Sequence, residues 1–438
     1  MGSIGFIALS EADYGLDGHV DSLVKRTLAV MKEMDIPVKD IGIISSEISA
    51  KEAGIQLSCS KIDGVVIFLS SWVKCSVLMA VYREIDHLPI CLWGFPMWMD
   101  GSTERSTGSY VSYAMIMGVL NRLSRPFTGI LGFPENSKEE INRFYLAARA
   151  YQMLKRSRIG LVGYSSMSIY PGTFDHLLLR AMIGPEVEHI DSYTCINIAE
   201  QQSAGQKHDV VKQLEDLATI RPDVSRDSLL KASGLYLALQ ELKRSLALDA
   251  INVKCQYEFS KEYAMTMCIP LSLANDRQLL ANCEGDVLCT VSMMILHYLT
   301  NQTVAYGDAI THDGSVLKLS PCGYMPFSLG CGKLEISNFM PNCGFSGIQC
   351  CFVMKPGKVT VLRLVEDIGS YHILYFTGEG IDTNKRQGYM PALDIILDGN
   401  IERLIENYAG QHFAICYGDV SESIEVLAKM LKVKTVRI

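Results

Sequence analysis

The hydrophobic pattern of the chain changes near residue 305, and this change limits the folds that it can adopt. Before it, short apolar runs alternate with stretches that carry apolar residues at helical spacing, which is typical of parallel sheets covered by helices. After it, short alternating strands are separated by Gly, Asn and Pro turns, as around Gly357–Leu364, which indicates an antiparallel barrel or sandwich. The sequence therefore predicts α/β layers followed by a mainly β region.

The α/β part predicts two doubly wound, Rossmann-like domains, residues 1–156 and 157–300. Residues 301–438 are expected to form a mainly antiparallel, barrel-like C-terminal domain. In the second domain, a strand is predicted at Ala250–Phe259 and a helix at Asp286–Leu299. In the first domain, strands are predicted at Ile4–Leu9, Gly64–Leu69, Pro89–Trp93 and Gly129–Phe133.

Composition excludes several classes of partner. Apolar residues make up 48% and charged residues 20% of the 438 positions, as in a compact globular protein with little disorder. The net charge of −8 and the lack of Lys/Arg runs argue against a nucleic-acid partner. Because no apolar stretch approaches the ~20 residues of a membrane-spanning helix, we expect no membrane association.

The cysteines and the start of the sequence indicate a cellular compartment. The 14 cysteines include no Cys-x-x-Cys pair and lie mostly in apolar runs, where a free thiol packs as a small hydrophobic group. The first residues, Met1–Phe6, lack the basic segment of a secretory signal. We therefore expect reduced thiols and a cytoplasmic protein.

Two carboxylates and one histidine suggest a metal site. Glu258, Asp286 and His412 each lie where a predicted strand or helix begins or ends, the usual place for reactive side chains in α/β proteins. Two oxygens and one imidazole nitrogen suit Mn²⁺, Mg²⁺ or Fe²⁺ and leave positions open for a substrate. Glu284 competes with Asp286 for the ligand position, and His312 is a further candidate ligand.

Each of these three residues also has a purely structural interpretation. Glu258 could be a strand-end carboxylate that faces solvent. Asp286 precedes an apolar helix and has the character of an N-cap, which is stabilising by itself. His412 lies in an apolar strand, where a histidine often bonds a neighbouring carbonyl group.

Two segments resemble the fucose/arabinose isomerase group. The sequence Cys-Glu-Gly-Asp-Val-Leu at Cys283–Leu288, followed by Ser292–Met294 and His297–Thr300, resembles the Glu-x-Asp segment of L-fucose isomerases. The segment Gln411–Asp419 is similar to the Asn-His-x-x-x-x-Tyr-x-Asp ending of that family. The family's order of two α/β domains and a β domain agrees with the pattern described above.

The resemblance implies a metal-dependent aldose–ketose isomerase that acts on a monosaccharide through a cis-enediolate. The sugar would be a deoxy sugar, a pentose or an acid-substituted sugar such as a sulfo-sugar. By resemblance, Glu258 and Asp286 are both catalytic and metal-binding, His412 completes the ligands, and Asp286 is favoured over Glu284. The expected ion is Mn²⁺, with Mg²⁺, Co²⁺ and Fe²⁺ also suitable.

The resemblance also implies substrate contacts and an assembly. A trimer or hexamer is expected, in which the loop Trp93–Trp98 of one subunit lies near the site of another, and aromatic faces stack on sugar rings. Contacts to the sugar are expected from Gln256, Gln411, Trp93 and Trp98.

One departure from the family pattern keeps a second function class open. Arabinose-type members place a metal histidine before a Cys-Gly or Leu-Gly turn, where this chain has Pro321 followed by Cys322–Gly323. Proline cannot bind a metal ion, so the three-ligand fucose arrangement is expected. The alternative is a non-catalytic sugar-binding or regulatory protein of the same fold. An NAD-dependent oxidoreductase is disfavoured because Arg158–Tyr164 lacks the complete Gly-x-Gly-x-x-Gly pattern.

Overall fold

The computed structural model describes residues 2–11, 18–339, 344–383, 386 and 388–438. The chain divides into two compact units, one of residues 1–152 with 422–432 and one of residues 153–421 with 433–438. Residues 422–432, near the end of the sequence, are grouped with the first unit. The three expected domains, residues 1–156, 157–300 and 301–438, stay a prediction.

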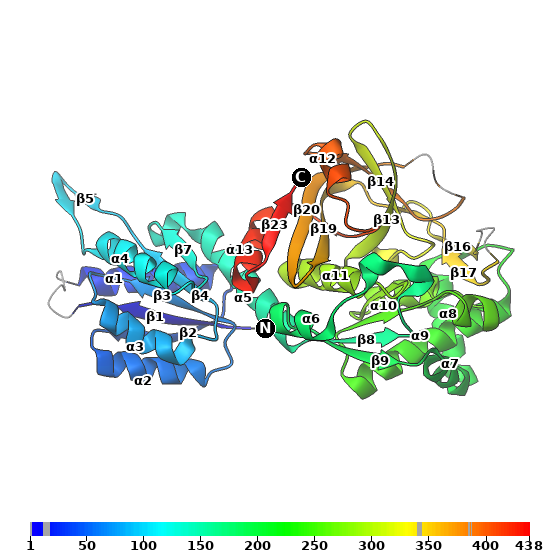
Figure 1. Cartoon of the computed structure of the whole chain (residues 1–438), viewed down its shortest axis with the longest axis horizontal. Helices are drawn as coiled ribbons and strands as arrows, with labels where there is room; N and C mark the ends of the chain where they lie inside the picture. The colour runs from blue at the N-terminus through cyan, green and yellow to red at the C-terminus, as the bar shows by residue number, and fades with distance from the viewer. Residues whose placement is uncertain (1, 12–17, 340–343, 384–385, 387) are drawn as a thin grey trace. The chain divides into compact units, whose positions relative to one another are not determined.

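The first unit is built on a five-stranded parallel sheet in the order β2-β1-β3-β4-β7 (Figure 1). Side chains of β1 alternate between two apolar clusters, with Ile7 and Leu9 on one face and Phe6 and Ala8 on the other, so both faces are buried, as in a doubly wound sheet. The strands are β1 (Ile4–Leu9), β2 (Val38–Ile44), β3 (Gly64–Leu69), β4 (Ile90–Gly94) and β7 (Thr128–Leu131).

Helices cover both faces of this sheet. One face carries α2 (Glu47–Ser58), α3 (Cys75–Ile85) and α4 (Ser109–Arg122), and the other carries α1 (His19–Glu33) and α5 (Lys138–Arg156). The helix α13 (Ser421–Leu431) and a small hairpin of β5 (Trp98–Asp100) and β6 (Thr103–Arg105) complete the elements.

The second unit begins with a four-stranded parallel sheet in the order β12-β11-β8-β9. The strand predicted at Ala250–Phe259 is shorter than expected, because β11 ends at Val253. Tyr257 has a φ of 58°, which a strand cannot accommodate, and a π-helical turn, Glu258–Glu262, follows. The other strands are β8 (Arg158–Val162), β9 (Glu186–Ile190) and β12 (Leu280–Cys283).

Within the described residues, five helices belong to this part of the second unit, which also contains two small sheets. The helices are α6 (His176–Met182), α7 (Ser192–Gln201), α8 (Ala204–Leu217), α9 (Arg226–Leu246) and α10 (Cys268–Asp276). The small sheets are formed by β10 (Thr219–Ile220), β16 (Glu335–Asn338) and β17 (Ile348–Cys350), and by β15 (Gly330–Cys331) and β18 (Val353–Met354).

A large, mainly antiparallel sheet forms the rest of the second unit. Its order is β19-β22-β13-β14-β21-β20-β23, and an additional antiparallel pairing of β19 with β20 closes six of the strands into a ring. The strand β23 pairs with β20 in parallel. The elements are β13 (Ala305–Asp313), β14 (Val316–Ser320), β19 (Gly357–Asp367), β20 (Ser370–Ile381), β21 (Leu393–Leu397), β22 (His412–Tyr417), β23 (Lys434–Arg437) and α12 (Ile401–Glu406).

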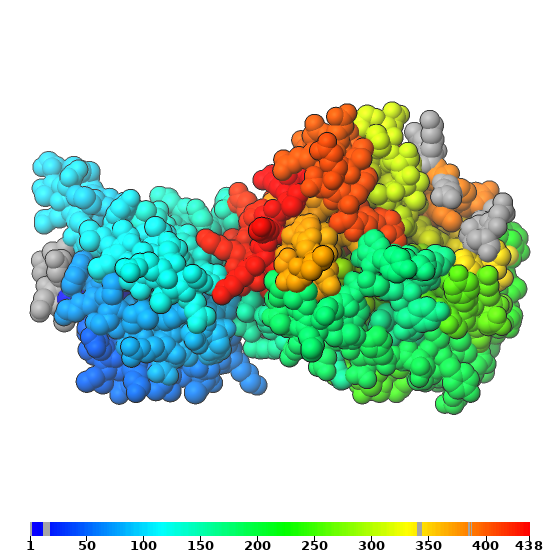
Figure 2. All heavy atoms as spheres, in the orientation of Figure 1, coloured from blue at the N-terminus to red at the C-terminus, as the bar shows by residue number. Residues whose placement is uncertain are grey.

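The helix α11 (Val287–Thr300) connects the parallel sheet to the antiparallel one. It is apolar on almost all sides, and every residue except His297 and Thr300 is buried. It packs against β11 and β12 on one side and against β19 and β22 on the other. In the space-filling view, the green segment and the yellow-to-orange segment meet in close contact (Figure 2). The N-terminus of α11 therefore lies inside the unit, where the two sheets meet.

Among the described residues, none of the helices combines the length and the apolar character needed to cross a membrane.

Candidate active site

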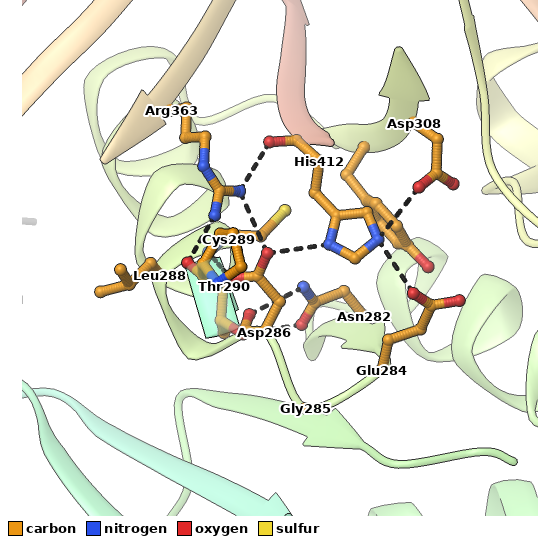
Figure 3. A network of polar contacts seen from close by, with 12 residues as sticks. Asn282, Glu284, Gly285, Asp286, Leu288, Cys289, Thr290, Asp308, Arg363 and His412 are labelled. Atoms are coloured by element: carbon orange, nitrogen blue, oxygen red, sulfur yellow. Dashed lines mark hydrogen bonds and ion pairs between the residues drawn. The ribbon is translucent and has the colours of Figure 1, made fainter. Parts of the chain in front are cut away.

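A buried imidazole lies between carboxylates where β12, β13 and β22 meet (Figure 3). His412 is the first residue of β22, directly opposite Asp308 of the neighbouring antiparallel strand β13. The Nε2 atom of His412 is 3.3 Å from Asp308 Oδ1 and 3.2 Å from Glu284 Oε2. The possible ligand atoms of Glu284, Asp308 and His412 all lie within 4.8 Å of one another. We call these three residues the candidate metal centre.

The turn after β12 brings two carboxylates to the same imidazole ring. Glu284 and Gly285 both have a φ of 72°, in the left-handed region that favours glycine. A Cβ atom at Gly285 would lie 2.2 Å from the carbonyl oxygen of Tyr164, so a side chain there is excluded. Because of this turn, Glu284 faces Nε2 of His412, whereas Asp286 Oδ2 accepts a hydrogen bond from Nδ1 at 2.8 Å.

Both oxygens of Asp286 are already engaged. Oδ1 accepts from the backbone N–H of Cys289 at 2.8 Å and caps α11. Oδ2 accepts from His412 and from Nη1 of Arg363 at 3.0 Å. The fully buried Arg363 also donates to the carbonyl oxygens of His412 and Pro171, at 2.8 and 2.7 Å. Asp286 is therefore bonded as a side chain that orients His412.

The charges in this group shift its pKa values strongly. Burial would raise the pKa of Asp286, but the charge of Arg363 and the hydrogen bond from His412 lower it to about 2. Burial would lower the pKa of His412, but Asp308, Asp286 and Glu284 together raise it well above its ordinary value. In the absence of an ion, this raised pKa favours a protonated imidazole at neutral pH, which partly offsets the charge of the surrounding carboxylates.

Glu284 is held in its ionised form. Burial is the largest influence and raises its pKa, but the close contact with the charged His412 and the hydrogen bond that Cys322 Sγ donates to Glu284 Oε1 at 3.2 Å together outweigh it. The resulting pKa lies below the ordinary value of a glutamate. Glu284 is thus a carboxylate at neutral pH.

The three residues fit a divalent cation. Nε2 of His412 is buried and has no hydrogen bond of good geometry with any described residue, although two carboxylate oxygens are close to it. Two oxygens and one nitrogen match the ligands of Mn²⁺, Mg²⁺ or Fe²⁺. The side chain of Asp308 is 19% exposed, so the centre is accessible from that side.

The structure brings together only part of the predicted ligand set. Asp286 and His412 are in contact, but Glu258 pairs with Lys254 at 2.5 Å and does not belong to the candidate metal centre of the described residues. Glu284, the competing candidate, does belong to it. His312 is exposed near the end of β13 and does not.

Sequence reasoning missed Asp308. A signal was present, because Asp308 is a charged residue directly after the apolar stretch Val304–Gly307, but its proximity to His412 depends on strand pairing.

The predicted sugar-contacting residues differ in their surroundings. Gln256 is buried, and its Oε1 has no partner among the described residues, while Gln411 is half-buried and precedes His412. Trp93 requires a correction: it is fully buried in the first unit, with Nε1 donating to the carbonyl oxygen of Gly132 at 2.9 Å. It therefore presents no face to a sugar. Trp98 is half-buried on β5 and contacts Phe133.

Over most of its length, the chain is similar to proteins named sulfoquinovose isomerase. It is 23% identical over 395 residues to the protein of Priestia aryabhattai, which covers 86% of this chain and 85% of the relative. It is 26% identical over 380 residues to the protein of Clostridium sp. (strain MSTE9), which covers 81% of this chain and 82% of the relative. Its homologues include sugar isomerases. No protein-family model matches the chain.

Solved structures add little to this relationship. The arabinose-binding protein AraP of Geobacillus stearothermophilus is 11% identical and covers 68% of this chain and 88% of its own, with a TM-score of 0.19. This score is too low to indicate a common fold.

Proposed function

We propose that the chain is an aldose–ketose isomerase that acts on a sulfo-sugar and uses a divalent cation held by Glu284, Asp308 and His412. One observation carries the proposal: a buried imidazole nitrogen lies between two carboxylates, in a homologue of proteins named sulfoquinovose isomerase. Mn²⁺ is the expected ion, since oxygen and nitrogen ligands suit it, although they also suit Mg²⁺, Co²⁺ and Fe²⁺.

The reaction moves one proton between C1 and C2 of the sugar while the two oxygens exchange carbonyl and hydroxyl character. When bound, the cation supplies a Lewis acid for these oxygens. One of the two carboxylates, Glu284 or Asp308, would accept the proton from one carbon and return it to the other through a cis-enediolate of the sugar, and the second would carry the hydroxyl proton between the two oxygens. The lowered pKa of Glu284 keeps the carboxylate ionised at neutral pH, which is the form that can accept a proton.

In this proposal, the catalytic pair expected by resemblance is replaced. Asp286 becomes a positioning residue, because its two oxygens are bonded to Cys289, Arg363 and His412. Glu258 is not assigned as a metal ligand in this proposal, because it forms an ion pair with Lys254.

A panel of aldoses tests this function. Purified protein with measured metal content is incubated with a 6-sulfo-aldose, a 6-deoxy-aldose and a pentose, and ketose formation is followed. We expect turnover of the sulfo-aldose, its loss in chelator and its return with Mn²⁺. Metal-loaded protein that binds a sugar but forms no ketose from any of the three would favour the sugar-binding alternative.

The expected assembly and location belong to the same proposal. A trimer or hexamer with the loop Trp93–Trp98 near the site of another subunit stays a prediction, as does the cytoplasmic location. Light scattering of the active protein tests the first, and a stable, fully active monomer would contradict it.

A further inference from the structure

A buried cation lies at the same sheet edge as the candidate metal centre. Lys254 follows β11 directly, Glu284 follows β12 directly, and the parallel register pairs Val253 with Cys283. Lys254 and Glu284 therefore occupy equivalent positions on adjacent strands, which lie ~5 Å apart. The side chain of Lys254 has no exposed surface.

The Lys254 ammonium group is held by one carboxylate and two aromatic rings. Its Nζ donates to Glu258 Oε1 at 2.6 Å and lies 3.8 Å from the ring centre of Tyr164 and 5.4 Å from that of Tyr257. Such ring contacts favour a cation. Among the described residues, Glu258 is its ion-pair partner, and a buried ammonium group without a partner is costly.

The groups that cover Lys254 are partly exposed, and one of them, Tyr257, has a strained backbone conformation. The side chain of Glu258 is 38% exposed, and Tyr164 and Tyr257 are 56% and 41% exposed. Tyr257 has φ 58° and ψ −85°, outside the left-handed helical region, and Glu258 begins a π-helical turn. Strained residues and π-helical turns cluster at functional sites. Glu258 can therefore rotate into solvent while the core stays packed.

We propose that Lys254 binds the anionic end of the substrate, a tetrahedral oxyanion such as a sulfonate or phosphate, which displaces Glu258 from the ammonium group. This inference rests on the proposed function. The reacting end of the sugar lies at Glu284, Asp308 and His412, and the anionic end lies at the next strand. Glu258 acts as an internal competitor that neutralises Lys254 until the anion arrives.

The two members of the ion pair should have opposite effects on anion binding. Methanesulfonate and methyl phosphate are titrated into the intact protein at low salt. Glu258→Gln removes the competitor and should tighten binding by ~10-fold, whereas Lys254→Gln removes a charged hydrogen bond and should weaken it by ~10-fold or more. The matched control is Lys318→Gln, which disrupts the pair with Asp394 on the antiparallel sheet and should leave the affinity unchanged.

The outcomes separate this proposal from the proposed function. Tighter binding of either anion by Glu258→Gln supports Lys254 as the anion site. Unchanged or weaker binding of both anions overturns it, even if Lys254→Gln does not fold. If the anions behave as expected but no aldose is isomerised, the proposed function fails and the anion site stands. If a sulfo-aldose is isomerised with the same KM in both variants, the anion site fails.

Discussion

Asp286 and His412, 126 residues apart in the sequence, share a hydrogen bond of 2.8 Å between Oδ2 and Nδ1. Because Nδ1 is engaged there, Nε2 is the nitrogen that faces Glu284 and Asp308. A carboxylate behind an imidazole fixes its tautomer and orientation. The same bond therefore orients the ring and selects the nitrogen available to a cation.

Removing either carboxylate that faces Nε2 should strongly lower both turnover and metal content. We expect Glu284→Gln and Asp308→Asn to lower turnover by ~10²–10⁴-fold, the scale of a lost general base, and to lower metal content. Asp313→Asn, at the exposed end of β13, is the matched control and should change neither. Metal analysis and ketose formation are measured on all three. Full metal content and turnover in Glu284→Gln would contradict the assignment.

Arg363 should stabilise the protein as well as the site. Arg363→Met leaves the buried Asp286 carboxylate without its cation, and we expect the free energy of unfolding to fall by ~3–5 kcal/mol. Metal affinity should fall by ~10–100-fold, as for other side chains that orient a ligand. Arg226→Met, which breaks an exposed pair with Glu215, should cost less than ~1 kcal/mol. Equal stability of the two variants in urea would argue against this role.

The stability of the metal-free protein should depend on pH in a defined direction. The raised pKa of His412 contributes stability that is fully present below its unfolded value of ~6.5 and is lost as pH rises through the folded value. The lowered pKa of Asp286, about 2, contributes stability that is present above ~4 and is lost as pH falls toward 2. The melting temperature in chelator should therefore be highest at mildly acidic pH.

A His412→Gln variant provides the control for this pH dependence. It should flatten the decline of the melting temperature above pH ~6.5. A chelated wild-type protein whose melting temperature rises from pH 6.5 to 9 would show that His412 is not held as a cation.

Proton transfer through carboxylates should exchange a carbon-bound hydrogen of the sugar with solvent. In D₂O, we expect deuterium to enter C2 of the sugar, because carboxylic protons equilibrate with water. NMR of the recovered aldose measures this exchange, and Glu284→Gln should suppress it together with turnover. Complete retention of the original hydrogen during rapid isomerisation would indicate a hydride shift instead.

The buried strands were predictable from the sequence because they are covered by apolar side chains on both faces. The strands β1 and β3 were predicted to the residue, since a parallel strand covered on both faces consists of one apolar run. In contrast, β2 lies at the sheet edge, and its half-buried and exposed residues give no such run. The predicted end of the strand at Phe259 was wrong, because the reversal at Tyr257 depends on a backbone angle that hydrophobic spacing does not encode.

The candidate site was only partly predictable, because it depends on backbone angles and strand pairings that the sequence pattern does not encode. His412 and Asp286 stand out in recognisable segments. The choice between Glu284 and Asp286 depends on two successive positive φ angles, which turn one side chain to each nitrogen of the imidazole. Asp308 becomes a neighbour of His412 only through the pairing of β13 with β22, which joins distant parts of the sequence.

That pairing has a consequence for how the protein folds. Contacts between distant parts of a chain are slow to form, because closing a long loop costs entropy before the contact repays it. The three candidate ligands come from the turn after β12, from β13 and from β22, so they meet only after β13 has paired with β22. A cation would therefore bind at the end of refolding, and it would slow the unfolding rate while leaving the folding rate almost unchanged.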